Sequence, residues 1–144
     1  MKKAVIRQVH GMTFTAKANS NHWVAMDGSV EEGGSAAASS PKEMVLLGLG
    51  GCTGMDVSSI LKKKRAQVDS FEIHITAEEA EDYPRIFTKI HIEYVFWGKN
   101  IRPQDVERAI EMSQTKYCSV TAMLRKSAEI IHSYRIEPPA SPRS

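Results

Sequence analysis

The segment from Ser40 to Arg65 constrains the fold of this 144-residue chain more than any other. Its opening, Ser40-Pro41-Lys42-Glu43, puts serine at the N-cap, proline at the first helical position and glutamate at the third. Its end, Lys62-Lys63-Lys64-Arg65, places positive charge where the helix dipole is negative. These signals predict a long helix from Pro41 to about Arg65.

The middle of this helix, Met44 to Met55, is apolar nearly all round and contains four glycines. Each interior glycine costs roughly 1 kcal/mol of helix stability relative to alanine. We therefore expect a helix that is buried on every side and closely approached by another helix, from this chain or a second copy. A chain of this size has too little sheet to wrap such a helix, which predicts a homodimer with helices packed at its centre. The apolar run is shorter than the ~20 residues of a membrane span, so no membrane partner is expected.

Alternation of apolar and polar residues predicts strands on both sides of the helix. The expected strands cover residues 4–9, 12–18, 22–26, 68–77, 86–97 and 130–136. Two further helices are expected, one opened by Pro103 and one over about 119–126. The pattern indicates an α+β protein with antiparallel sheets. With no internal repeat or domain linker, the pattern predicts a single domain over 1–137, followed by a disordered tail over 138–144.

The overall charge argues against several classes of partner. A formal net charge of +2 is too small to indicate binding to nucleic acid or to an anionic membrane surface. Residues 1–3 include two lysines, but residues 4–10 alternate instead of forming the apolar segment of a signal peptide. We therefore expect a cytoplasmic protein.

Cys52 and Cys118 are the two cysteines of the chain. In a reducing compartment they are inert core thiols, a redox pair or part of a metal site. Cys52 lies within the glycine cluster, in a predicted apolar pocket with Leu49 and Met55. Cys118 follows Lys116 at a predicted helix N-terminus, where the helix dipole stabilises a thiolate. Their separation matches no zinc spacing rule; a metal site built from both cysteines and a histidine ranks third.

Three segments together resemble the OsmC/Ohr family and, within it, its YhfA-like branch. They are residues 39–57, with Gly-Gly-Cys followed by Met-Asp-Val-Ser-Ser-Ile-Leu-Lys-Lys, then Pro84-Arg85-Ile86-Phe87-Thr88, and Lys116-Tyr117-Cys118-Ser119-Val120. The resemblance implies an intertwined homodimer in which two six-stranded sheets wrap around long central helices. It also implies two active sites at the dimer interface.

The resemblance further implies roles for both thiols. Cys52 is the expected peroxidatic thiol, which a hydrophobic organic hydroperoxide oxidises to a sulfenic acid. Cys118 then condenses with it to a disulfide, and a dithiol reductant such as a lipoylated protein restores the pair. Neither a cofactor nor a metal is expected.

The residues that activate the thiol in the family are not matched. Lys42 occupies the position of the family's glutamate, and Glu43 follows one place later. Glu43 is either the third catalytic residue or simply part of the capping box. No arginine lies between Arg7 and Arg65. The candidate substitutes are Lys17, Lys42 and Arg85.

Two functions follow from these observations. The first is a cysteine-dependent reductase of organic hydroperoxides, weakened by the unmatched activators. The alternative is a non-enzymatic dimer that binds a small apolar ligand or senses redox state, which the glycine-lined apolar helix favours.

Overall fold

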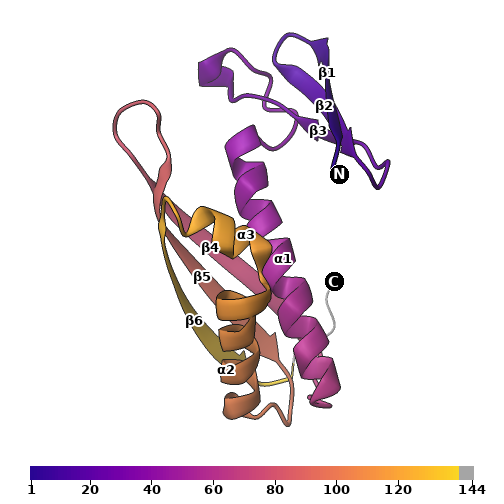
Figure 1. Cartoon of the computed structure of the whole chain (residues 1–144), viewed down its shortest axis with the longest axis vertical. Helices are drawn as coiled ribbons and strands as arrows, with labels where there is room; N and C mark the ends of the chain where they lie inside the picture. The colour runs from indigo at the N-terminus through magenta and orange to yellow at the C-terminus, as the bar shows by residue number, and fades with distance from the viewer. Residues whose placement is uncertain (140–144) are drawn as a thin grey trace. The chain divides into compact units, whose positions relative to one another are not determined.

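The computed structural model describes residues 1–139 and is shown in Figure 1. The chain divides into two compact units, Met1–Leu47 and a second that begins at Gly48. The helix α1 (Pro41–Lys63) contributes to both units. The single-domain boundary at 137 stays a prediction, and residues 140–144 of the predicted tail lie outside the described residues.

The first unit contains a small antiparallel sheet. Its strands are β1 (Ala4–His10), β2 (Thr13–Ala18) and β3 (Val24–Met26), hydrogen-bonded in that order. Gly11 has a φ of +56°, which suits the tight turn between β1 and β2. A 3₁₀ turn, η1 (Val30–Glu32), follows. The three strands predicted from alternation are confirmed.

Asp27 ties the segment after β3 to this sheet. Its carboxylate, on a residue only 2% exposed, accepts hydrogen bonds from three backbone N–H groups and one hydroxyl. The donors are Gly28 (2.8 Å), Ala37 (3.1 Å), Ser35 (3.3 Å) and the Thr13 hydroxyl (3.3 Å). The N–H of Ala37 contributes most to lowering the pKa of Asp27, and this lowering exceeds the opposing effect of burial. The loop predicted over 29–40 is therefore anchored at one carboxylate.

Replacing Asp27 by asparagine is expected to remove a pH-dependent part of the stability. Because the folded-state pKa is lowered, this contribution is present above the unfolded pKa of about 3.9 and is lost as the pH falls through the folded pKa. The urea midpoint of Asp27→Asn should lie below that of wild type at neutral pH and approach it near pH 3. Asp82→Asn, in the exposed β4–β5 connection, is the control. An Asp27→Asn deficit that is the same at both pH values would contradict the assignment.

The second unit packs helices on a three-stranded sheet. Its strands are β4 (Ser70–Glu79), β5 (Phe87–Trp97) and β6 (Glu129–Glu137), in that order. Between β5 and β6 lie α2 (Pro103–Met112), the π-helical turn η2 (Ser113–Tyr117) and α3 (Ser119–Leu124). Figure 1 shows α1 and α2 on the same side of this sheet. The predicted α+β fold is confirmed, with two three-stranded sheets and one long helix.

The expectation of purely antiparallel sheets is wrong for this unit. Strands β4 and β5 are antiparallel, with Ile75 opposite Ile92, but β6 runs parallel to β5, with Tyr94 opposite Tyr134. A parallel pair requires a long crossover, and the connection that carries α2 and α3 provides it. The sheet is therefore mixed.

The core lies between this sheet and α1. On β5, the alternating residues Ile90, Ile92, Tyr94 and Phe96 are fully buried, as the sequence pattern predicts. On α1, a stripe of residues spaced four apart is buried: Leu49, Thr53, Val57 and Leu61. Residues four apart share one helix face, so this stripe seats α1 on the sheet.

The rest of α1 corrects the prediction of a helix buried on every side. A Cβ at Gly54 would lie 2.9 Å from Ile73 Cδ1, and one at Gly50 would lie 3.2 Å from Ile75 Cδ1. These two glycines therefore let α1 approach strand β4, not another helix. A Cβ at Gly48 or Gly51 would meet nothing within 4 Å, so these glycines face open space in the single chain.

Among the described residues, α1 is also long and apolar enough to cross a membrane, judged by length and composition. Its fully buried residues Leu49, Thr53 and Val57 pack within the chain itself. Helix α1 thus has the burial of a partly covered core helix.

Candidate active site at two thiols

The fold brings Cys52 and Cys118 together although 66 residues separate them in sequence. Their sulfur atoms and a carboxylate oxygen of Asp56 all lie within 4.8 Å of one another. Both cysteines are free; Cys52 is half-buried and Cys118 is 4% exposed. The predicted proximity of the two thiols is confirmed, and Asp56 is an addition that sequence reasoning missed.

Thr53 fixes the orientation of α1 next to Cys52. Its hydroxyl lies 2.7 Å from the hydroxyls of both Tyr94 and Ser113. The side-chain amide of Gln114 donates to Thr53 Oγ1 and to Tyr94 Oη, both at 3.1 Å. All of these groups are buried, where an unmade hydrogen bond costs ~1–3 kcal/mol. The network therefore fixes the rotation of α1, and with it the direction of its neighbour Cys52.

The π-helical turn η2 places the second thiol. The N–H of Cys118 donates to the carbonyl of Ser113 at 2.8 Å, five residues earlier. Cys118 then leaves the helical conformation, with φ −75° and ψ 99°, and becomes the N-cap of α3. Its sulfur accepts the N–H of Thr121 at 3.4 Å. The predicted break between helices and the position of Cys118 at a helix start are both confirmed.

The site does not stabilise a Cys118 thiolate in the way that the sequence predicted. Burial raises the pKa of Cys118, because a charged thiolate is poorly solvated there. The hydrogen bond from the Thr121 N–H acts in the opposite direction, while Cys52 raises the pKa further. Helix α3 has six residues, so its dipole is weak. Lys116, the predicted source of positive charge, lies over the Tyr117 ring at 5.1 Å.

Asp56 completes the local polar environment. Its carboxylate accepts a hydrogen bond from the Ser113 hydroxyl at 2.9 Å. Burial, opposed by the hydrogen bonds from Thr53 and Gln114, raises the pKa of Tyr94 to about 12, so this hydroxyl stays protonated at neutral pH. The sequence signal for Asp56 is its spacing: it lies four residues after Cys52, on the same helix face.

Glu43 forms the predicted capping box. Its Oε1 accepts the Ser40 N–H at 2.8 Å, and its own N–H donates to Ser40 Oγ at 3.2 Å. The Ser40 N–H is the main cause of the lowered pKa of Glu43. Glu43 belongs to the first unit, and its catalytic role stays a prediction.

The candidate basic substitutes contact aromatic rings. Lys17 Nζ lies 5.0 Å from the centre of the Trp23 ring, and Arg7 Cζ lies 5.3 Å from it. Arg85 Cζ lies 4.8 Å from the centre of the Tyr83 ring. Activation of Cys52 by Lys17, Lys42 or Arg85 stays a prediction.

Two histidines, His74 and His91, have polar neighbours in the structure. His74 lies 3.3 Å from Glu72, and the Nε2 of His91 lies 2.7 Å from the Ser133 hydroxyl. A histidine was considered as the third metal ligand beside the two cysteines. In the structure, the third donor group close to both sulfur atoms is the carboxylate of Asp56.

The sequence and the fold are both similar to known proteins. A family model described as OsmC-like protein matches residues 33–133. Protein YhfA of Escherichia coli strain K12 is 40% identical over 134 residues, which are 93% of this chain and 97% of that protein. A hypothetical protein from Aquifex aeolicus VF5 superposes with a TM-score of 0.85 at 30% identity, over 97% of this chain and 98% of that one.

More distant structures share the fold alone. An organic hydroperoxide resistance protein OsmC from Legionella pneumophila superposes with a TM-score of 0.69 at 10% identity, over 93% of this chain and 96% of that one. The extended family match and the level of identity to YhfA decide the classification. The chain belongs to the OsmC-like protein family, in its YhfA-like branch.

Proposed function

We propose that this protein is a cysteine-dependent reductase of organic hydroperoxides. The observation that carries this function is the convergence of two free thiols, Cys52 and Cys118, within 4.8 Å. The half-buried Cys52 is the more accessible of the two, and so it is the proposed site of peroxide attack.

The proposed reaction has three balanced steps. The Cys52 thiolate attacks the distal peroxide oxygen, the O–O bond breaks, and an alcohol leaves with one proton while Cys52 becomes a sulfenic acid. The Cys118 thiol attacks that sulfur, forming the disulfide and releasing water. A dithiol, with a lipoylated protein as the proposed physiological donor, reduces the disulfide by exchange and is itself oxidised.

The family supports a hydroperoxide as the substrate class. Structures that share the fold include organic hydroperoxide resistance proteins from Legionella pneumophila and Elizabethkingia anophelis. Burial raises the pKa of Cys118, which disfavours the thiolate form of that residue. We therefore expect turnover to be slow. An assay that couples dithiol oxidation to hydroperoxide loss tests the function; turnover no faster than the uncatalysed reaction would contradict it.

A homodimer is the proposed assembly, and α1 supplies the first reason. Its residues Gly48, Gly51, Met55 and Ser58 form one exposed stripe with a spacing of three or four. Small residues in such a stripe allow the close approach of a second helix. Met55 is 76% exposed in the single chain, which a second copy of α1 would cover. Proteins of the OsmC family are typically dimeric.

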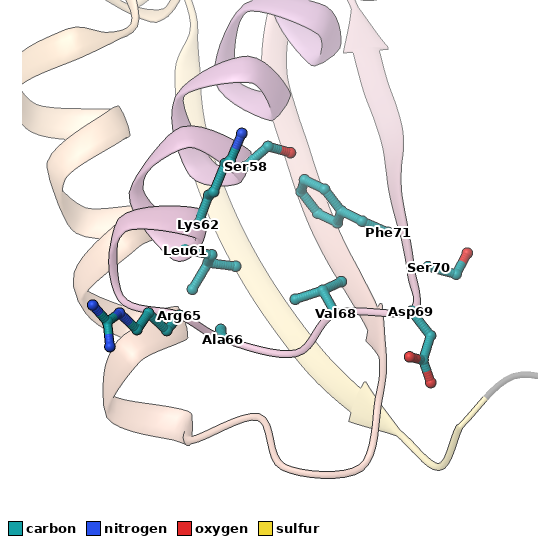
Figure 2. Close-up of a pocket in the computed structure, with 9 residues that line it drawn as sticks. All are labelled: Ser58, Leu61, Lys62, Arg65, Ala66, Val68, Asp69, Ser70 and Phe71. Carbon is teal, nitrogen blue, oxygen red and sulfur yellow. The ribbon is translucent and has the colours of Figure 1, made fainter.

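A groove beside this stripe supplies the second reason. One cavity of about 520 Å³ is lined by Gly51, Gly54, Met55, Ser58, Phe71 and Ile73. A second, of about 450 Å³, is also lined by Ser58 and Phe71 and extends to Arg65, in the turn after α1. Figure 2 shows the second cavity between α1, the following connection and the start of β4. We propose that a second copy of the chain occupies this groove.

The first unit supplies the third reason, because its sheet exposes many large apolar side chains. Each of the following is at least 44% exposed: Val5, Ile6, Val9, Met12, Trp23 and Val24. Because so much exposed apolar surface is uncommon on a monomer, we propose that a second copy of the chain covers part of it.

The homodimer is expected to show twice the 16.0 kDa chain mass in sedimentation equilibrium at micromolar concentration. Met55→Glu should shift the equilibrium toward the monomer, because it places a charge in the proposed interface. Met123→Glu, which makes the same change at an exposed methionine on α3, is the matched control. A wild-type protein that sediments as a monomer would contradict the assembly.

The alternative function is a non-enzymatic cytoplasmic dimer that binds a small apolar ligand or senses redox state. The unmatched activating residues favour it, because Lys42 stands at the position of the family's glutamate and no arginine lies between Arg7 and Arg65. Native mass spectrometry of the purified protein, together with titration of Cys52 by a thiol reagent, distinguishes the two. A ligand that co-purifies with the protein, together with ordinary reactivity of the Cys52 thiol, would favour binding over catalysis.

A further inference from the structure

We propose that the reduced protein binds a zinc-class divalent cation between Cys52, Asp56 and Cys118. This inference goes beyond the proposed peroxide chemistry and does not depend on it. The supporting observations are the convergence of the three donor atoms, the hydrogen bonds behind them, and two buried polar atoms that lack partners.

The donor set suits a borderline-soft cation. Two sulfur ligands select zinc and related thiophilic metals over magnesium or calcium, and a single carboxylate oxygen is a common third zinc ligand. Cys52 and Asp56 lie four apart on α1, so both face the same direction. Cys118 comes from the turn before α3. Rules for the spacing of zinc ligands in sequence do not detect this site, because the fold brings its ligands together from distant segments of the chain.

The distances require only a small contraction. All three donor atoms lie within 4.8 Å of one another. Ligands around tetrahedral zinc, at about 2.0–2.3 Å from the metal, are ~3.5–3.8 Å apart. Cys52 and Asp56 are only partly buried, so we propose that rotation of their side chains supplies this contraction. Three protein ligands leave the fourth tetrahedral position for water or another small ligand.

Hydrogen bonds already orient two of the ligands. The Ser113 hydroxyl donates to Asp56 at 2.9 Å and is held in turn by Thr53 at 2.7 Å. The N–H of Thr121 donates to the Cys118 sulfur at 3.4 Å. Hydrogen bonds from surrounding groups to the metal-binding side chains fix the orientation of those side chains in metal sites.

Two buried polar atoms next to this cluster lack hydrogen-bond partners. Among the described residues, Gln114 Oε1 and Thr121 Oγ1 are the buried side-chain atoms in this condition. Thr121 is fully buried and bonded through its N–H to Cys118, and Gln114 is 5% exposed and bonded to Thr53. Buried unpaired polar atoms require an explanation, and a bound ion with its water is one.

The test uses reduced full-length protein, without peroxide and in the absence of oxygen. Zn²⁺ affinity is measured by competition with a chromophoric chelator, and Co²⁺ is used as a spectroscopic probe of sulfur ligation. Wild type is expected to bind one Zn²⁺ per chain and to show a thiolate-to-Co²⁺ charge-transfer band. Asp56→Asn is expected to weaken Zn²⁺ binding roughly tenfold or more, and Cys52→Ser to weaken the band.

Asp82→Asn, in the exposed β4–β5 connection, is the matched control and should bind as wild type does. Because Cys118 is buried, both Cys118→Ser and Cys118→Ala are made and checked by circular dichroism. Equal Zn²⁺ affinity in wild type, Asp56→Asn and Cys52→Ser would overturn the proposal and assign the metal to surface groups. No peroxide enters this measurement, so its failure is distinct from failure of the peroxidase function.

Discussion

Cys52→Ser is expected to lower dithiol-dependent hydroperoxide consumption by roughly a hundredfold or more, to the uncatalysed rate. A serine hydroxyl at this position is not ionised at neutral pH and cannot form a sulfenic acid. The substitution exchanges one atom of similar size at a half-buried position. The fold should therefore survive, and the loss should appear in the catalytic rate and not in the yield of folded protein.

Cys118→Ser separates the roles of the two thiols. It should still reduce one equivalent of hydroperoxide, because Cys52 is intact, and then stall as the sulfenic acid, which a dimedone adduct reveals. Ser59→Ala, at an exposed position on α1, is the control and should turn over normally. Unchanged consumption by Cys52→Ser would end the proposed mechanism.

Leu49→Ala is expected to have the largest effect on stability, lowering the free energy of unfolding of the second unit by ~2–5 kcal/mol. Leu49 is fully buried in the stripe that seats α1 on the sheet, three residues before Cys52. Removing it leaves a cavity that a helix anchored by the Thr53 hydrogen bonds cannot close. Chemical denaturation followed by circular dichroism measures the loss.

Leu47→Ala is the matched control, because it makes the same change on the same helix at a residue that is 58% exposed. An exposed substitution usually changes stability by less than about 0.5 kcal/mol. Both variants are measured at several protein concentrations, since dimerisation adds a concentration-dependent contribution. Equal losses in the two variants would contradict the seating of α1 by this stripe.

Local patterns were sufficient to predict most elements. The capping box between Ser40 and Glu43 marks the start of α1 because both partners lie within one helical turn. Alternation along β5 predicts which side chains are buried because successive residues of a strand face opposite sides. Such patterns do not reveal whether a neighbouring strand runs parallel or antiparallel, so the parallel pairing of β6 with β5 was missed.

The candidate site was predicted in part, for a similar reason. Each cysteine could be recognised from its own segment through the family resemblance. Asp56 was missed because its importance depends on Cys118 and Ser113, which the chain brings to it only through η2. The role of Gly50 and Gly54 was misassigned because composition shows that something approaches closely, but not whether it is an isoleucine side chain of β4 or a helix.

The most direct test of the central claim is the intact mass of the reduced protein after one equivalent of cumene hydroperoxide, with and without a dithiol chase. A working Cys52–Cys118 pair predicts rapid loss of two hydrogens per chain, reversed by the dithiol. A mass that stays unchanged over many minutes would show that the thiols are inert toward this peroxide and would contradict the account.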